Sequence, residues 1–394
     1  VLTVVQETPI CKMKVSLAGY KRGETLTNFP VLVKFSNGLT NGFAYSQMFS
    51  PFGYDLRFKD ATETQDLNCE VENWDTNGES LVWVQVPQVT SNSYIWAIWG
   101  NSAVATPQPA CWSNGATWDS TYGAVWHMQE GGGTAMRDST ANANHGVLHQ
   151  GVAWTQGLAG NALLFNGVTT NYVSAGANAS LTLTNRFTLS AWICPLSYHT
   201  NAYYNIINGF LSRGPSSANT LNYALEAKNS TTVTFIKRTS TEGLQFYNFP
   251  VPAFTANWTL VTLEVADGTV SLYINGTLCG SQTVGAIVPV SGDVLYLGSI
   301  VTYQAETTYA GGLDEVRICN VAESADRVWA TWMNMASNGV FASLGTVSVS
   351  PVIADANMNG MPDLWERQYF GSTNAVNGGA RDDWDSDGMD NLSE

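Results

Sequence analysis

Short runs of apolar, β-branched and aromatic residues recur along the first hundred residues of the chain. Three of these runs lie at residues 31–35, 81–86 and 93–99. Runs of this length and composition are typical of β-strands. The pairs Asn37-Gly38 and Asn77-Gly78 are typical of the turns that separate strands. No stretch of this part sustains the helical spacing of apolar positions, so we predict a β-rich domain over residues 1–102.

The same pattern resumes over residues 121–345, after a segment at residues 103–120 whose prolines and glycine predict a linker. The pair Asn275-Gly276 between two apolar runs is a strong signal for a tight hairpin. Many short strands at regular spacing favour a β-sandwich. The clearest strands are predicted at residues 187–193, 258–265 and 270–274.

A short helix is predicted near the end of this second segment, over residues 324–335. Ser324 is a suitable N-cap residue, and Asp326 places a negative charge in the first turn. Beyond residue 345 the chain becomes acidic and rich in Gly and Asn, after a short predicted strand at residues 347–352. Residues 346–394 are therefore treated as a separate tail.

The tail contains two twelve-residue windows with the spacing of a calcium-binding loop. Ca²⁺ takes six to eight oxygen ligands, which such a loop supplies from positions 1, 3, 5, 7, 9 and 12, while glycine at position 6 permits a sharp turn. Position 7 contributes its backbone carbonyl. The predicted calcium ligands are Asp355, Asn357, Asn359, Met361, Asp363 and Glu366 in the first window, and Asp383, Asp385, Asp387, Met389, Asn391 and Glu394 in the second.

The second window offers four acidic side chains and the first offers three, so we expect tighter binding at the second. A helix is predicted over residues 363–370, with Trp365 and Tyr369 on one face. Because no helical pattern precedes Asp355, the tail resembles dockerin and thrombospondin type 3 repeats more than a full EF-hand. The alternative is an acidic disordered tail.

Taken together, these patterns predict an all-β fold class, with two jelly-roll-like β-sandwich domains and a short calcium-loop segment at the C-terminus. The predicted divisions are residues 1–102, the linker 103–120, the second sandwich at 121–345 and the tail at 346–394.

The charge and composition of the chain limit the classes of partner and the location that we expect for it. Charged residues make up only 12% of the 394 residues, and the net charge is −15. Nucleic-acid binding needs a basic surface, which this composition disfavours. No apolar run reaches the length of a membrane span. A low-charge surface rich in Ser, Thr and Asn favours an extracellular or cell-surface location.

Six cysteines are present, and none forms a Cys-x-x-Cys pair, which disfavours a zinc or redox motif. An even number favours disulfides formed in an oxidising compartment. Six cysteines allow 15 pairings, between which the sequence does not choose. Buried free thiols are the alternative.

Five segments of the first domain resemble a domain of unknown function that occurs in bacterial and archaeal surface proteins. They lie at residues 29–33, 53–58, 70–74 and 83–87 and in the strand that ends at Trp99-Gly100-Asn101. This family has no known activity, so the resemblance implies a fold and a surface location only.

The second domain resembles the concanavalin A-like, laminin-G-like jelly roll in five segments, at residues 125–128, 138–140, 162–167, 187–192 and 312–318. In that family an Asp at the head of the last strand binds a structural Ca²⁺. The resemblance therefore implies a calcium ligand at Asp314, with Asp138 nearby, and the role would be stability. A turn or strand-cap carboxylate is the alternative for Asp314.

Catalytic patterns are weak. Glucanases with this fold carry Glu-x-Asp-x-x-Glu on one strand, and residues 121–345 contain no such triplet. The nearest pattern is Glu70-x-Glu72-x-x-Asp75 in the first domain, where Glu70 and Glu72 share a strand face. The four histidines are scattered, so no zinc site is predicted.

Two aromatic segments are candidates for ligand binding and are predicted to be loops, at residues 198–205 and 245–250. Exposed aromatic rings beside amides suit sugar binding, and the first segment supplies Tyr198, Tyr203 and Tyr204. We therefore expect a non-catalytic, lectin-like adhesion protein that binds calcium and contacts carbohydrate or a surface protein. A structural subunit that self-assembles by strand pairing is the first alternative, and a glycan-active enzyme is the second.

Overall fold

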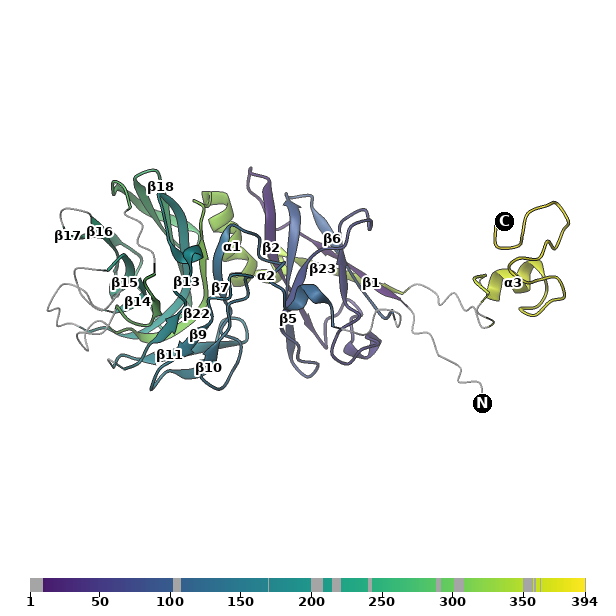
Figure 1. Cartoon of the computed structure of the whole chain (residues 1–394), viewed down its shortest axis with the longest axis horizontal. Coiled ribbons are helices and arrows are strands. Elements are labelled where there is room, and N and C mark those ends of the chain that lie inside the picture. The colour runs from purple at the N-terminus through teal and green to yellow at the C-terminus, as the bar shows by residue number, and fades with distance from the viewer. Residues whose placement is uncertain are drawn as a thin grey trace.

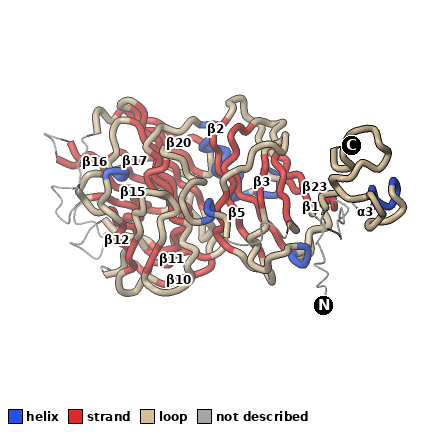
Figure 2. The backbone as a smooth tube through the Cα atoms, turned by 45° about the vertical axis from the view of Figure 1, so that its right-hand side comes forward, coloured by secondary structure: helices blue, strands red, loops and turns tan. Residues whose placement is uncertain are grey.

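The computed structural model describes residues 10–393 except 102–107, 169, 200–207, 215–220, 240–242, 288–291, 301–307, 350–356, 358 and 362. The described residues form two β-sandwiches and a small C-terminal loop region (Figure 1). Strands dominate and helices are few (Figure 2). The predicted all-β fold class is therefore confirmed.

The first sandwich packs a four-stranded sheet against a three-stranded one. Their strand orders are β23-β1-β6-β3 and β2-β5-β4. Met13, Val33 and Phe58 from both sheets are buried in its core. The bounds are β1 (Cys11–Ser16), β2 (Leu26–Ser36), β3 (Arg57–Lys59), β4 (Cys69–Asn73), β5 (Glu79–Val89), β6 (Tyr94–Trp99) and β23 (Ser343–Val349).

The second sandwich consists of two larger sheets. One has the order β10-β11-β22-β13-β18-β19-β20, with β7 also paired to β22, and the other has the order β17-β16-β15-β14-β21-β12-β9-β8. The strands of the first of these sheets are β7 (Tyr122–Trp126), β10 (Ala153–Gln156), β11 (Asn161–Asn166), β13 (Arg186–Ser197), β18 (Thr259–Ala266), β19 (Thr269–Ile274), β20 (Thr277–Thr283) and β22 (Ala310–Cys319). Those of the second are β8 (Ala135–Met136), β9 (Gly146–Leu148), β12 (Val173–Ala175), β14 (Gly209–Arg213), β15 (Tyr223–Asn229), β16 (Thr232–Thr239), β17 (Gly243–Pro250) and β21 (Leu295–Leu297).

The predicted hairpin at Asn275-Gly276 is confirmed, since it joins β19 to β20. Both residues have positive φ, at 49° and 72°, as the two-residue turns that match strand twist require. A Cβ on Gly276 would lie 3.0 Å from the Cα of Trp329. The hairpin therefore packs directly on the helix that follows the last strand of this sandwich.

That helix, α1 (Ala325–Ala336), confirms the predicted helix and its cap. The Ser324 hydroxyl accepts a hydrogen bond from the Arg327 amide at 3.1 Å. A short helix, α2 (Asn338–Phe341), follows, and Phe341 is buried in the core of the first sandwich. In the tail, α3 (Asp363–Tyr369) confirms the helix predicted after the first loop, and the rings of Trp365 and Tyr369 lie 4.8 Å apart.

The chain returns to the first sandwich after completing the second. Strand β23 pairs antiparallel with β1, with Met13 opposite Val347. The division predicted at residue 345 thus falls inside a strand of the first sandwich. The predicted linker also differs in its second half, because Trp112 and Trp118 pack into buried clusters.

The two sandwiches share an apolar cluster of their own. Leu32 and Trp83 from the first meet Trp118, Trp192 and other apolar residues of the second. The two domains are adjacent along this contact (Figures 1 and 2). It places the charged side chains described next at an interface between domains.

Candidate functional site

Five charged side chains meet at the interface of the two sandwiches, and we call them the junction cluster: Glu70, Glu72, His127, Glu315 and Arg317. Strand β4 of the first sandwich supplies the first two. His127 directly follows β7, and the last two lie on β22, which pairs with β7. Alternation along β4 and β22 turns side chains two residues apart to one face.

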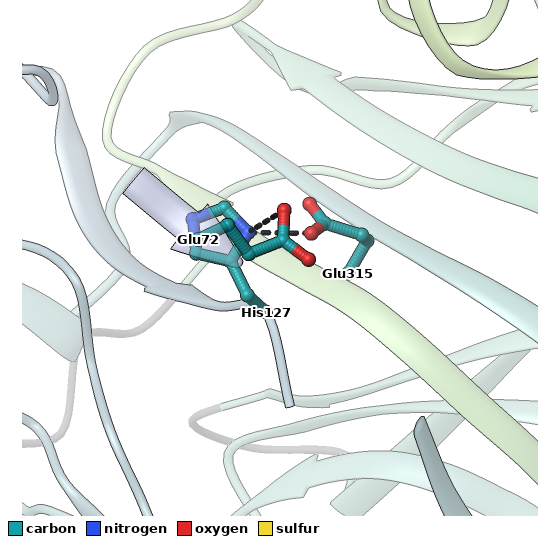
Figure 3. Close-up of side chains that lie close together, drawn as sticks. All are labelled: Glu72, His127 and Glu315. Atoms are coloured by element: carbon teal, nitrogen blue, oxygen red, sulfur yellow. Dashed lines mark hydrogen bonds and ion pairs between the residues drawn. The ribbon is translucent and has the colours of Figure 1, made fainter. Parts of the chain in front are cut away.

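One nitrogen of the His127 imidazole faces carboxylates from both domains, Glu72 and Glu315 (Figure 3). Its Nδ1 contacts Glu315 Oε1 and lies 3.6 Å from Glu72 Oε2. Its Nε2 lies 3.8 Å from Glu70 Oε2. The ligand atoms of Glu72, His127 and Glu315 all lie within 4.8 Å of one another. Their side chains are 0%, 4% and 1% exposed, so this group is shielded from water.

Neighbouring tryptophans orient the carboxylates. Trp83 Nε1 donates to Glu72 Oε2 at 2.6 Å, and Trp118 Nε1 donates to Glu70 Oε2 at 2.5 Å. Glu70 Oε1 accepts from the Ser139 hydroxyl at 2.7 Å. A buried carboxylate with such donors is held in one position.

Arg317 holds the remaining carboxylate. Its Nη2 donates to Glu315 Oε2 at 2.6 Å, and its guanidinium stacks 4.5 Å from the Trp83 ring centroid. The His127 ring also stacks on Trp83. Glu315 and Met128 both have positive φ, at 48° and 59°. Non-glycine residues adopt this conformation at a cost, and such strain gathers at functional sites.

Burial and mutual charge shift the pKa values inside the cluster. Burial raises the pKa of Glu72 to about 8, although His127 lowers it in part. Burial alone would lower the pKa of His127, but the Glu315 and Glu72 carboxylates outweigh it and raise that pKa well above its usual value. Burial would raise the pKa of Glu315, but His127 and Arg317 lower it overall. Shifts of this kind are common at functional sites.

A cavity of about 230 Å³ opens onto the cluster. Glu70, Glu72, His127, Gln129 and Arg137 are among the residues that line it. Three buried atoms of the cluster, Glu72 Oε1, His127 Nε2 and Arg317 Nε, have no hydrogen-bond partner. Unpaired polar atoms beside a polar cavity are suited to a small polar ligand or a cation.

The second tail loop brings its predicted acidic ligands together. Carboxylate oxygens of Asp383, Asp385 and Asp387 lie within 4.8 Å of one another, and all three residues are exposed. The Gly388 amide donates to Asp383 Oδ2 at 3.0 Å, with φ at +99°. Three carboxylates around a glycine turn form one side of an oxygen shell suited to Ca²⁺.

The first loop repeats two of the hydrogen bonds of the second at equivalent positions. In each, the amide at position 5 donates to the side chain at position 3, from Asn359 to Asn357 and from Asp387 to Asp385. In each, the amide at position 7 donates to the side chain at position 5. The glycines at position 6 both have φ near +90°, at 90° and 99°. The two loops therefore share one backbone conformation around their centres.

Glu366 closes the first loop. Its Oε1 accepts hydrogen bonds from Asn357 and Asn359 at 2.9 and 2.7 Å. The side chain is fully buried, and its Oε2 has no partner. The buried Asp363 and Met361 lie in the same loop.

Four predicted calcium ligands of the tail remain to be placed. The Asn391 side chain accepts from the Trp384 amide at 2.9 Å and donates to two backbone carbonyls, so it ties the second loop together. Met389, the position 7 residue, is exposed, as a carbonyl ligand of a surface loop can be. Asp355 and Glu394 lie outside the described residues.

Asp314 is fully buried on β22. Its Oδ2 accepts from the Leu158 amide at 2.9 Å, and its Oδ1 has no partner. Burial and the nearby Glu315 raise its pKa well above the usual value. Asp138 accepts hydrogen bonds from Val125, Thr140 and Asn144, which makes it a structural carboxylate of its own turn. The calcium role of Asp314 remains a prediction.

Of the aromatic candidates, Tyr198 follows β13 and packs against the core of the second sandwich, with its hydroxyl buried. Tyr203 and Tyr204 lie outside the described residues. The second aromatic segment is a strand, β17, where we expected a loop, because its alternating residues pair with β16. Phe246 is exposed at the edge of that sheet, while Phe249 is buried.

The disulfides expected from the cysteine count are absent from the described part of the chain, which includes all six cysteines. The thiols of Cys69 and Cys111 are in contact at 3.7 Å. Cys69 directly precedes Glu70 of the junction cluster on β4.

Sequence reasoning identified only part of the junction cluster. The sequence predicts that Glu70 and Glu72 share a strand face, and the structure brings both to the interface, while their catalytic role stays a weak hypothesis. His127 was set aside as one of four scattered histidines, and Glu315 and Arg317 were noted only for fold resemblance. Their alternation on the last strand is the one signal that could have marked them.

No curated protein sequence matches the chain. Among solved structures, the binding domain of Paraclostridial Mosquitocidal Protein 1 is 13% identical over 54% of this chain and 52% of that one, with a TM-score of 0.43. The botulinum neurotoxin serotype G binding domain is 12% identical over 55% and 52%, with a TM-score of 0.44. This chain spans about half the length of both toxin domains.

Domain 4 of AbnA, an extracellular arabinanase from Geobacillus stearothermophilus solved in complex with arabinotriose, is 20% identical. That match covers 53% of this chain and 97% of the arabinanase domain, with a TM-score of 0.39.

Two family models match parts of the chain. Residues 165–328 match the concanavalin A-like lectin/glucanases superfamily, and residues 53–118 match a domain of unknown function, DUF2341. Neither match reaches the tail, whose resemblance to dockerin and thrombospondin type 3 repeats stays a prediction. The chain is thus similar to DUF2341 in part of its first half and to the concanavalin A-like superfamily in part of its second sandwich.

Proposed function

We propose that this chain is an extracellular, lectin-like binding protein whose C-terminal tail binds calcium. Support for the lectin-like part comes from the concanavalin A-like domain, a fold typical of extracellular proteins. Residues 121–345 also lack the Glu-x-Asp-x-x-Glu strand of the glucanases with this fold. No helix among the described residues is long and apolar enough to span a bilayer.

The observation that carries the calcium proposal is the shared conformation of the two tail loops. Equivalent amides donate to equivalent side chains at positions 3 and 5 in both loops, and glycine turns the chain at position 6 in both. This leaves carboxylate oxygens of Asp383, Asp385 and Asp387 facing one another in the second loop. Unscreened repulsion between them would open the loop, so a divalent cation favours the closed form.

In the first loop the buried Glu366 supports the same proposal. It occupies position 12, whose two oxygens close the far side of a calcium shell. One of these oxygens is buried without a partner. A buried carboxylate oxygen is costly when it is unpaired, and a bound Ca²⁺ would satisfy it.

Isothermal titration calorimetry with CaCl₂ on the full chain tests the calcium proposal. We expect two ions per chain, and the loss of one in Asp383→Ala. Asp390→Ala is the matched control, because it removes one negative charge of the same loop at a position that is not a ligand. Unchanged stoichiometry in Asp383→Ala, or equal loss in both variants, would contradict the proposal.

For the ligand, we propose carbohydrate bound at the segment that joins β13 to β14. The partly buried Tyr198 anchors the start of this segment on the core, which leaves Tyr203 and Tyr204 as the candidate contact rings. A glycan array with the wild-type chain tests this. We expect hits that Tyr203→Ala and Tyr204→Ala reduce and that Tyr369→Ala, an exposed ring in the tail, retains.

Self-assembly is the second candidate, and the place of β23 favours it. This strand lies at one end of its sheet and, among the described strands, pairs with β1 alone. Outside that pairing, the Val347 amide donates to the Asn41 carbonyl at 2.8 Å. An open strand edge can add a strand from another copy. Size-exclusion chromatography at several concentrations separates the two candidates: polymers without glycan hits favour assembly, and a glycan-binding monomer favours the lectin-like function.

A further inference from the structure

We propose that Glu72, His127 and Glu315 bind a single divalent transition-metal ion, of the zinc class, between the two sandwiches. The scattered histidines of the sequence predict no zinc site, but folding brings one of them between two carboxylates. This site is separate from the calcium loops of the tail and differs from them in ligand chemistry.

The ligand set selects the class of metal. Imidazole nitrogen and carboxylate oxygen are both ligand types that Zn²⁺ accepts, and three protein ligands leave a fourth position for water. Ca²⁺ instead favours six to eight oxygens. His127 Nδ1 lies 3.6 Å from Glu72 Oε2, a span that a metal–ligand shell of about 2 Å radius can bridge.

Residues around the three proposed ligands hold them in place by hydrogen bonds and charge contacts, as is common in metal sites. A metal-bound histidine commonly presents its second nitrogen to a carboxylate. Here His127 Nδ1 faces Glu72 and Glu315, and Nε2 faces Glu70 Oε2 at 3.8 Å. Trp83 Nε1 and Arg317 Nη2 orient the two ligating carboxylates from outside.

An unpaired buried atom gives an independent indication of a missing partner. Glu72 has a fully buried side chain, and its Oε1 makes no hydrogen bond. Buried polar atoms are normally paired, so this oxygen lacks the partner that a metal ion bound by Glu72 would supply.

The position of the cluster determines how a metal ion reaches it and what the bound ion does to the two domains. The cavity of about 230 Å³ reaches Glu72 and His127 from outside, which provides a path and room for a water ligand. Because Glu72 belongs to the first sandwich and the other two ligands belong to the second, the ion would clamp the two domains together.

Zinc titration of the full chain tests the proposal. The chain is stripped with chelator, and excess CaCl₂ occupies the tail loops before ZnCl₂ is added in the calorimeter. We expect one Zn²⁺ per chain and a loss of affinity of about 100-fold or more in Glu72→Gln and His127→Gln. Glu70→Gln, which removes the outer partner of His127, is expected to weaken binding about 10- to 100-fold.

Cys111→Ser is the matched control, because it removes a partly exposed thiol that could bind Zn²⁺ elsewhere in the chain, and we expect it to bind Zn²⁺ as the wild-type chain does. Equal affinity in wild-type and His127→Gln chains, or the absence of Zn²⁺ binding by the folded wild-type chain, would overturn the proposal. If the variants do not fold, Co²⁺ absorption of the wild-type chain decides the matter. Visible absorption bands of Co²⁺ bound by nitrogen and oxygen ligands would support the proposal. A charge-transfer band from a thiolate ligand, or the absence of any Co²⁺ band, would refute it.

Discussion

Cys69 and Cys111 illustrate how one contact between residues sets chemical reactivity. The Cys69 thiol donates toward Cys111, and this hydrogen bond lowers the pKa of Cys111 to about 6 despite partial burial. The same contact, with burial, raises the pKa of Cys69 well above its usual value. Thiolates are the nucleophilic form, so one of the two sulfurs is activated at the expense of the other.

We expect iodoacetamide to alkylate Cys111 with a half-maximal rate near pH 6, because the thiolate fraction rises as the pH passes the pKa. Cys279 is a matched control, since it is also partly exposed and burial raises its pKa. Its rate is expected to rise only above pH 8. Mass spectrometry of peptides after timed labelling measures both rates. Equal pH profiles for the two residues would contradict the expectation, and Cys69→Ala is expected to move the Cys111 profile to higher pH.

Helix α1 shows at the scale of elements how an open sheet edge is covered. Strand β2 is the end strand of its sheet, and its outer edge faces α1. Asn334 Oδ1 accepts from the Leu32 amide at 3.0 Å, and its Nδ2 donates to the Pro30 carbonyl at 2.9 Å. Asn338 Nδ2 donates to the Leu32 carbonyl at 2.7 Å. These side chains replace the missing neighbouring strand, which satisfies the buried edge.

We expect Asn334→Ala to lower the free energy of unfolding by about 2 to 4 kcal/mol, because it leaves one buried amide and one buried carbonyl unpaired. Chemical denaturation followed by tryptophan fluorescence measures this change. Asn257→Ala is the control, since Asn257 is exposed and bonds only a neighbouring threonine, and its effect is expected within about 0.5 kcal/mol. Similar small effects for both variants would mean that water reaches the edge of β2.

At the scale of the whole molecule, the pair of sandwiches, which we call the body, and the tail are built differently. The apolar cores of the two sandwiches, and the cluster between them, include no residue beyond Val347. The tail has its own small aromatic contact between Phe370 and Trp384, with ring centroids 4.8 Å apart. In Figure 1 the tail lies apart from both sandwiches, beyond β23. The stability of the body therefore depends on β23 and not on the tail.

Two truncations test this division. A chain that ends at residue 349 keeps β23, and we expect its melting temperature to match the full chain within about 2 °C. A chain that ends at residue 342 loses β23, so the edge of β1 and the core around Leu344 and Val347 become exposed. We expect that chain to melt roughly 10 °C lower or to fail to fold. Differential scanning calorimetry measures both, and equal melting temperatures would contradict the role assigned to β23.

Local patterns were enough to predict the strands, the hairpin at Asn275-Gly276, the cap at Ser324 and the spacing of the tail loops. Each of these features depends on neighbours within a few residues, so its physical cause is written in the sequence itself. The same reasoning predicted a loop at residues 245–250, because aromatic density alone does not tell an edge strand from a loop. Pairing with β16 decided that segment.

Only the tertiary structure assembled the junction cluster and returned β23 to the first sandwich. His127 and Glu315 are 188 residues apart in the sequence. Strand β23 follows the whole second sandwich in the sequence, yet it pairs with β1, the first strand of the first sandwich. Alternation shows which face of a strand is buried but not which distant strand covers it. That choice comes from packing the two sandwiches together, with the tryptophans of the interface, and it places three carboxylates around one imidazole.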